Sequence, residues 1–167
     1  MRDCLNTVPH FYFITDIYYY MKPSKITTVK AKKAWYLPPK IRALTWMGIV
    51  YCKYREDVDS INRTDKIDSM LKSHETIHVR QAESMHNSWL LFYARYIWEW
   101  VVNIPLLTIN RWAAYKFMPI EMEAYSYERD YGYASNGKVV GWKELEKLTL
   151  KEKRELAKKY YNSKNKH

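Results

Sequence analysis

Residues 89–109 form an apolar stretch, WLLFYARYIWEWVVNIPLLTI, that is about as long as a membrane-spanning helix. Arg95 and Glu99 stand near its centre, however, and a charged side chain at that depth is costly in lipid. The two charges are four residues apart, so on a helix they lie on one face and can pair. We therefore expect a buried aromatic helix with an internal ion pair, which ends at Pro105, rather than a membrane span.

The segments on either side of this stretch predict one α+β domain with appendages. A chain of 167 residues is long enough to bury a single core. Residues 26–37 and 43–55 carry many β-branched and aromatic side chains, which predicts two strands of a small antiparallel sheet. Residues 57–68 are polar and are expected to form a loop. The other elements expected are helices that begin near residues 64–68, 119 and 150 and end near residues 86, 131 and 161.

We divide the chain into an aromatic N-terminal arm over residues 1–25, a domain over residues 26–135 and a basic C-terminal tail over residues 136–167. The arm carries Phe11, Phe13 and three successive tyrosines, so it must pack on the core or on a partner. The net charge of the chain is +10. The tail could bind the phosphates of nucleic acid or an acidic protein. Acids interspersed among its bases favour a solvated helix face instead.

Cys4 and Cys52 are the only cysteines and lie far apart, so we expect neither a disulfide framework nor a thiolate zinc site. Residues 11–21, FYFITDIYYYM, contain Asp16 and are not followed by a small-residue cleavage site. They therefore do not read as a secretion signal. The expected location is the cytoplasm.

The sequence HETIH at residues 74–78 is the strongest chemical signal in the chain. On a helix, residues four apart lie on one face, so His74 and His78 can present their imidazoles to one metal ion, with zinc the expected metal. Glu75 flanks such an ion, where it can accept a proton from water that the ion activates. The alternative is a pair of buried histidines with ordinary hydrogen bonds.

Apolar residues around the motif indicate the helix that a metal site requires. They recur at spacings of three, four or their multiples, and the two histidines fall within the same inward-facing stripe: Ile67, Met70, Leu71, Ile77 and Met85. His86 lies about 12 Å further along the helix than His78, too far to share the ion. The HExxHxxGxxH class is excluded, because Gln81 and Ser84 stand where that class has glycine and histidine.

A third ligand has to come from elsewhere, and residues 119–130, PIEMEAYSYERD, offer three glutamates. Glu121, Tyr125 and Glu128 share one helix face, whereas Glu123 points nearly the opposite way. Glu121 and Glu123 could also serve only to compensate the helix dipole. With the histidine pair upstream, a metal ligand on this helix is the better interpretation, and Glu121 and Glu123 are its two candidates.

These motifs resemble the gluzincin group of zinc metallopeptidases, and more closely small, mostly uncharacterised bacterial and phage proteins of that type. Four patterns between residues 30 and 130 carry the resemblance: KAxxxP (Lys33, Ala34, Pro38), HExIHxxQxE (74–83), YxWEW (96–100) and AYxxxPxExEAY (114–125). The resemblance implies a zincin-like fold. In it, the sheet packs on the HExxH helix, the aromatic helix and the glutamate helix, with the C-terminal helix added.

The resemblance also implies that His74, His78 and Glu121 bind zinc and that Glu75 is the general base. Gluzincins often have Asp or Asn four residues after the ligand glutamate, where it orients a metal-bound histidine. Tyr125 stands at that position here, and its hydroxyl is the expected substitute. Tyr125 equally fits a site that binds metal without turnover.

Two further expectations concern substrate. In zincin-like folds the strand before the metal helix borders the cleft and can pair with an extended peptide. Residues 47–54 are the candidate strand, and a plain core strand is the alternative. Tyr115 and Tyr125 are candidates to stabilise the tetrahedral intermediate.

The expected function is a zinc-dependent metallopeptidase that acts on a peptide or protein, with Glu75 deprotonating the attacking water. The alternative is a non-catalytic structural or interaction subunit of a larger assembly, such as a phage virion. Its protein partners would bind the aromatic arm and the basic tail. Nucleic-acid binding has only the charge of the tail in its support.

Overall fold

The structure is a computed structural model that describes residues 29–37, 41–135 and 139–164, so the predicted N-terminal arm lies outside the described residues. Within them the chain forms three strands, eight α-helices and one 3-10 helix, which confirms the α+β class. The strands are β1 (Lys30–Lys33), β2 (Ala43–Trp46) and β3 (Ile49–Cys52). The long helices are α2 (Arg55–Asn62), α3 (Met70–Ser84), α4 (Trp89–Val102), α6 (Pro119–Tyr127) and α9 (Leu150–Lys164). The short ones are η1 (Ile104–Thr108), α5 (Ala113–Lys116), α7 (Tyr131–Ser135) and α8 (Trp142–Leu145).

The sheet is mixed rather than antiparallel. Its order is β1-β3-β2, and the central strand β3 runs parallel to β1 and antiparallel to β2. Met47 and Gly48 have φ angles of 49° and 79° and form a tight turn, which folds residues 43–55 into a hairpin instead of one strand. The hairpin leaves the other side of β3 free for β1. The prediction of an antiparallel sheet was wrong because Met-Gly is not one of the usual hairpin signals.

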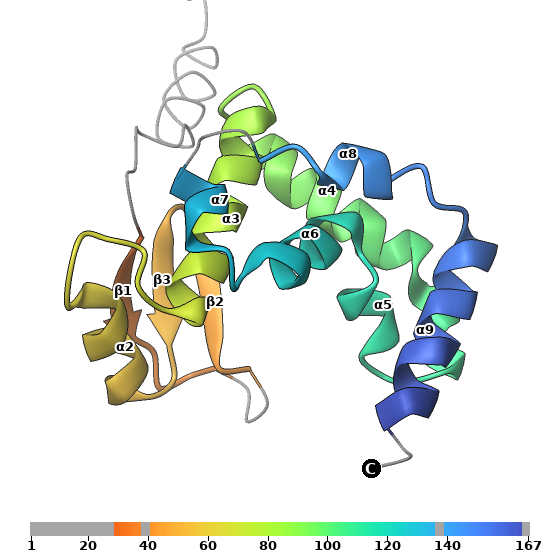
Figure 1. The fold of residues 1–167 in the computed structure, drawn as a ribbon, viewed down its shortest axis with the longest axis horizontal. Coiled ribbons are helices and arrows are strands. Elements are labelled where there is room, and N and C mark those ends of the chain that lie inside the picture. The colour runs from red at the N-terminus through yellow and green to blue at the C-terminus, as the bar shows by residue number, and fades with distance from the viewer. Residues whose placement is uncertain (1–28, 38–40, 136–138, 165–167) are drawn as a thin grey trace, which may run out of the picture.

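One row of side chains across the sheet faces the interior. Ala31, Val50 and Thr45 are in register on the three strands, and all three are buried. Since β2 is an edge strand, this row places Thr45 at the edge of the sheet. The sheet lies at one end of the molecule and α9 at the other, with α3 and α6 between them (Figure 1).

Residues 57–68 were expected to form a loop, but α2 occupies the first half of this segment. Asp57 is buried and accepts two hydrogen bonds from the guanidinium of Arg42, at 2.8 and 2.6 Å. Ile61 is fully buried against the sheet. Tertiary contacts therefore stabilise a helix whose polar sequence does not predict it.

α3 begins later and ends earlier than the sequence predicts. Ser69 caps its first turn, with its hydroxyl accepting a hydrogen bond from the Lys72 amide at 3.3 Å. The helix ends at Ser84, and His86 and Asn87 follow with φ angles of 55° and 56°. Those two left-handed residues reverse the chain direction before α4 begins.

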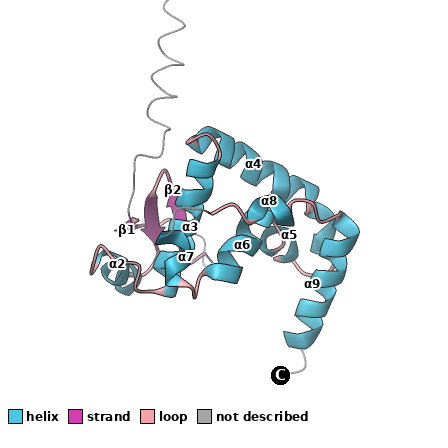
Figure 2. Ribbon diagram, turned by 45° about the horizontal axis from the view of Figure 1, so that its top comes forward, coloured by secondary structure: helices cyan, strands magenta, loops and turns pink. Residues whose placement is uncertain are grey.

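α4 contains the predicted ion pair but is not a buried helix. Arg95 Nε lies 3.0 Å from Glu99 Oε1, and Glu99 is buried. Only three of the 14 residues of α4 are buried, and the helix runs along an edge of the molecule (Figure 2). The expectation of burial was wrong because one face alone packs on the body. None of the described helices is long and apolar enough to cross a membrane.

The described part of the C-terminal tail contains α8 and α9. Thr149 and Glu152 form the predicted capping box: the Glu152 amide donates to Thr149 Oγ1 at 3.3 Å, and the Thr149 amide donates to Glu152 Oε2 at 2.8 Å. Ala157 of α9 is buried in a cluster with Leu106 and Phe117. The tail therefore packs on the helices that precede it. Lys153 is buried, with Nζ 3.4 Å from Asn103 Oδ1, and the other described lysines and arginines of the tail are at the surface.

Candidate metal centre

Two helices bring three potential ligands together. α3 presents His74 and His78 from successive turns, and α6 presents Glu121 from its first turn. Ligand atoms of the three side chains all lie within 4.8 Å of one another, and all three residues are buried. His74 Nε2 lies 3.6 Å from Glu121 Oε2, and His78 Nε2 lies 3.5 Å from Glu121 Oε1. Tetrahedral zinc ligands with bonds of about 2.0–2.1 Å stand about 3.3–3.5 Å apart, so the two contacts of Glu121 are close to the ligand spacing of a zinc site.

The ring of His74 is held by a carboxylate on its far side. Its Nδ1 lies 3.0 Å from Glu128 Oε2. A carboxylate only accepts, so Nδ1 carries the proton and donates it. This hydrogen bond turns Nε2 toward Glu121, as the ligand role requires.

The ring of His78 is held in the same way by an amide. Gln81 donates from Nε2 to the Ile120 carbonyl at 2.9 Å and to Glu123 Oε2 at 2.7 Å. Both of those partners are acceptors, so Gln81 Oε1 must face His78, where it accepts a hydrogen bond from Nδ1 at 2.8 Å. The Nε2 of His78 is thereby left to face the centre.

One oxygen of Glu121 provides a test of whether a metal fits. Tyr96 donates its hydroxyl to Glu121 Oε1 at 2.8 Å, which satisfies that oxygen. Glu121 Oε2 is buried and has no hydrogen-bond partner among the described residues. An unpaired buried carboxylate oxygen costs free energy. A cation between this oxygen and the two imidazoles would remove that cost, so the donor set fits a divalent metal.

The charges of these groups are strongly coupled. Burial lowers the pKa of His74, but the Glu121 carboxylate, 3.6 Å from Nε2, and the hydrogen bond with Glu128 outweigh burial and raise this pKa to about 10. Burial raises the pKa of Glu121, but the charges of His78 and His74 beside it outweigh burial and hold this pKa below its usual value. Without a metal, the centre is therefore a buried carboxylate beside a protonated imidazole. A metal ion must displace the proton on His74 Nε2.

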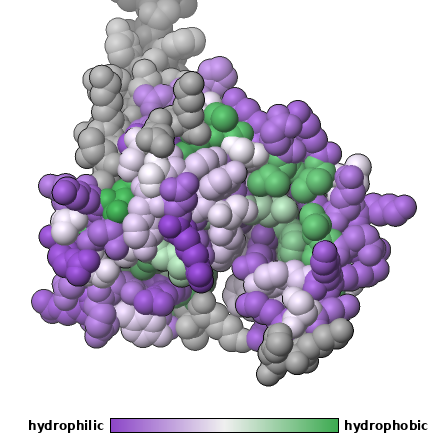
Figure 3. Space-filling view, viewed as in Figure 1, coloured by the Kyte–Doolittle hydropathy of each residue, from purple (hydrophilic) through white to green (hydrophobic). Residues whose placement is uncertain are grey.

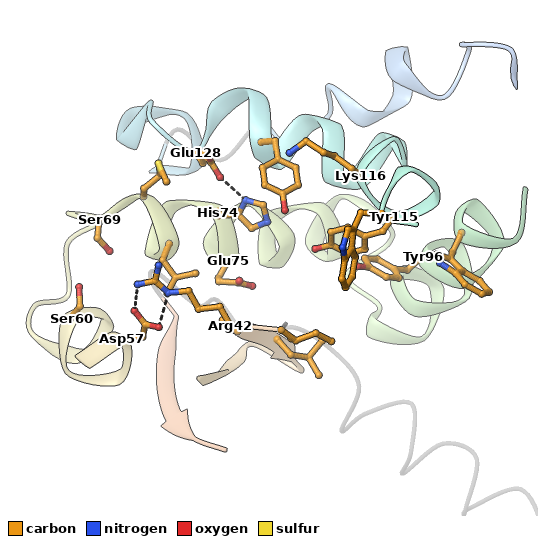
Figure 4. A pocket seen from close by; sticks show the side chains of 18 residues that line it. Arg42, Asp57, Ser60, Ser69, His74, Glu75, Tyr96, Tyr115, Lys116 and Glu128 are labelled. Atoms are coloured by element: carbon orange, nitrogen blue, oxygen red, sulfur yellow. Dashed lines mark hydrogen bonds and ion pairs between the residues drawn. The ribbon is translucent and has the colours of Figure 1, made fainter. Parts of the chain in front are cut away.

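Glu75 projects from α3 into a cleft beside this cluster (Figure 4). Thr45 Oγ1 of β2 donates a hydrogen bond to Glu75 Oε2 at 2.5 Å, so the edge strand fixes the carboxylate. The cleft has a volume of about 940 Å³ and is lined by residues of β2, α2, α3, α4, α5 and α6. The molecular surface is hollowed between the side of the sheet and the side of α5 and α9 (Figure 3).

Tyr115 and Tyr125, the two tyrosines singled out from the sequence, both line this cleft. The ring of Tyr125 packs edge-on against His74, with centroids 4.8 Å apart, and Lys116 Nζ lies 3.8 Å from the centroid of Tyr125. Burial raises the pKa of Tyr125 to about 12 and also raises that of Tyr115. Both hydroxyls are therefore protonated donors at neutral pH.

Several sequence-based expectations change once the side chains are placed. Glu121 joins the histidines, whereas Glu123 faces away and accepts hydrogen bonds from Gln81, Tyr133 and the Gly141 amide. Glu128, not Tyr125, is the hydrogen-bond partner of His74. The signal for Glu128 was its position two turns after Glu121 on the same face.

The candidate substrate strand also changes. Residues 47–54 include β3, which has a partner on each side and cannot pair with a peptide. β2 is the edge strand that borders the cleft, because Ala43 and Leu44 line it and Thr45 contacts Glu75. The hairpin turn at Met47 and Gly48, which the sequence did not predict, causes this exchange of roles.

Comparisons of the chain with protein-family models, curated proteins and solved structures find no match.

Proposed function

We propose that this protein is a zinc-dependent metallopeptidase of the gluzincin type, with His74, His78 and Glu121 as metal ligands. The observation that carries the proposal is the Glu121 carboxylate, whose buried Oε2 has no hydrogen-bond partner and lies beside His74 Nε2, while Oε1 lies beside His78 Nε2. The outer nitrogens of both imidazoles are already hydrogen-bonded. A histidine pair with a purely structural role does not need a carboxylate with an unpaired oxygen as its neighbour. The packing of the sheet edge, α3, α4 and α6 around one cleft agrees with a zincin-like arrangement.

Two neutral nitrogen ligands and one carboxylate, with room for a fourth ligand, form the donor set typical of catalytic zinc. Zinc supplies a Lewis acid, which polarises a carbonyl and lowers the pKa of water. Glu128 and Gln81 hold the two imidazoles in the tautomer that leaves Nε2 free, so the chain supplies the orientation that such a site needs.

Glu75 is the proposed general base. Its carboxylate lies in the cleft beside His74, and Thr45 restricts its rotation through the hydrogen bond to Oε2. Glu75 would take a proton from the attacking water and deliver it to the leaving amine. Tyr115 and Tyr125 would donate hydrogen bonds to the oxyanion that forms on the carbonyl, since both are protonated and line the same cleft.

A peptide is the proposed substrate because an unpaired strand edge borders the cleft. β2 pairs only with β3 among the described strands, so its other edge is free to bind extended main chain. A peptide aligned along β2 would pass Thr45 and bring its carbonyl groups past Glu75 and the metal centre. A non-catalytic scaffold needs no such alignment.

The test is cleavage of a fluorogenic peptide library by the zinc-loaded protein. We expect cleavage by the wild type, and Glu75→Gln should reduce it by at least about 1000-fold with zinc retained, because the base is lost and the ligands are not. Glu83→Gln, on the same helix two turns away, should leave cleavage unchanged. Zinc binding without cleavage of any peptide in the library would favour the interaction subunit instead.

A further inference from the structure

The solvent-facing side of α4 and of η1 as far as Leu107 is apolar. We call it the outer stripe, and its members are Leu90, Leu91, Ala94, Ile97, Trp98, Val101, Val102, Ile104 and Leu107. These residues recur at helical spacing and none is charged. Ile97 and Trp98, at the centre, are each 62% exposed. Exposed apolar surface of this extent marks a contact with another molecule.

The charges of α4 are turned away from the outer stripe. Arg95 pairs with Glu99 at 3.0 Å and with Glu146 of the C-terminal tail at 2.5 Å. Glu99 is buried and also accepts a hydrogen bond from the Ile120 amide at 3.3 Å. The two charges that make a membrane span costly therefore do not oppose a helix that lies flat on a membrane surface.

Basic side chains flank the C-terminal end of the outer stripe. Arg154 of α9 reaches Thr108 of η1, with Nη2 3.4 Å from the hydroxyl oxygen. Lys151 stands about one turn before Arg154 on α9 and is exposed. Lys158, about one turn after Arg154, is exposed as well and pairs with Glu155 at 3.1 Å. Arg111, three residues after Thr108, is exposed as well. The outer stripe thus ends beside a group of cations on a chain with a net charge of +10.

We propose that the outer stripe binds the surface of an anionic lipid bilayer, with α4 lying in the plane of the interface. An apolar helix face that carries tryptophan and is bordered by lysine and arginine has the composition of an interfacial helix. The basic flank would contact lipid phosphates, and each such base strengthens binding to an anionic surface. Two copies of a chain with charge +10 repel each other, so charge favours the bilayer over a second copy as the occupant. This inference is independent of the proposed peptidase activity.

The test is co-sedimentation of the full chain with vesicles of two compositions. One is phosphatidylcholine alone, and the other contains equal parts phosphatidylcholine and phosphatidylglycerol. We expect binding to the anionic vesicles that is at least about tenfold stronger than to the neutral ones. The double variant Ile97→Ser/Trp98→Ser should weaken anionic binding by at least about tenfold, because it removes the apolar centre of the outer stripe.

A matched control removes an exposed aromatic pair elsewhere. Trp35 and Tyr36, after β1, are 87% and 59% exposed, so Trp35→Ser/Tyr36→Ser should leave vesicle binding unchanged. Arg111→Glu/Arg154→Glu should reduce binding to the anionic vesicles only. Circular dichroism of each variant verifies that it is folded.

Three results would overturn the proposal. The first is no binding to either vesicle, and the second is anionic binding that survives Ile97→Ser/Trp98→Ser. The third is a dimer in analytical ultracentrifugation that this double variant dissociates, which would assign the outer stripe to a second copy of the chain.

Discussion

Glu128 lies against the far side of His74, with a carboxylate oxygen 3.0 Å from Nδ1, although the two residues are 54 positions apart in the chain. Because this contact sets which nitrogen of His74 carries the proton, it determines which nitrogen faces Glu121. The geometry of the centre therefore depends on a residue outside the ligand set.

Glu128→Ala should weaken zinc binding by about 10- to 100-fold without removing a ligand, because the imidazole of His74 loses its orientation. A chelator-dye competition at neutral pH measures this affinity. Asp130→Asn, an exposed change two residues away, should have no effect. An unchanged zinc affinity in Glu128→Ala would show that packing alone orients His74.

Gln81 connects His78 to a buried network on α6, so we expect it to affect stability even without metal. Gln81→Leu removes the side-chain amide that donates to Glu123 Oε2 and to the Ile120 carbonyl. Because two buried acceptors lose their donor, the free energy of unfolding should fall by about 2 kcal/mol. Urea unfolding of the metal-free protein measures the change. Asp59→Asn, an exposed change on α2, should change stability by less than about 0.5 kcal/mol.

For the pair of Arg95 and Glu99, we expect removal of the cation alone to cost more stability than replacement of both charges. Arg95→Leu leaves Glu99 buried without its cation, and we expect a loss of about 2 kcal/mol, less than for a fully buried pair because Arg95 is partly exposed. Arg95→Leu/Glu99→Gln should regain part of this loss, since the amide still accepts from the Ile120 amide. The midpoint of thermal unfolding measures both variants. If Arg95→Leu and Arg95→Leu/Glu99→Gln lower it equally, then packing of Arg95, and not its charge, stabilises α4.

Cys52 should be chemically inert in the folded protein. Burial raises the pKa of its thiol from 9.0 to about 12, so at pH 8 the thiolate is only about one part in 10,000. The folded pKa exceeds the unfolded one, so the contribution of this group to stability is complete below pH 9 and is lost as the pH rises toward 12. Alkylation by iodoacetamide in a Cys4→Ser background should need denaturant. Rapid alkylation of the native protein would contradict the burial of this thiol.

Local patterns along the sequence were sufficient for some parts of the molecule. The stripe around His74 and His78 predicted an inward-facing helix, and Thr149 with Glu152 predicted the start of α9. Glu121 was placed on the face opposite Glu123, and the structure brings Glu121 to the histidines. Each of these inferences depends only on local helix signals, either periodicity or a capping box, which tertiary contacts did not override.

The features that the sequence did not predict depend on long-range contacts. α2 is held by Arg42 and by burial of Ile61 on the sheet, and its own sequence is polar. β2, and not β3, is the edge strand beside the cleft, because residues 43–55 fold back at a turn in which Met47 has a left-handed conformation. α4 is exposed because only one of its faces packs on the rest of the domain. The overall hydrophobicity of a segment does not indicate how many of its faces are buried.

The measurement that tests the central claim most directly is the metal content of the purified chain by elemental analysis. We predict about one zinc per chain in the wild type, lost in His74→Ala and in Glu121→Gln and retained in His86→Asn, which alters a histidine outside the centre. Absence of zinc from the wild type after incubation with the metal, or zinc that persists in His74→Ala, would contradict the assignment of the metal centre.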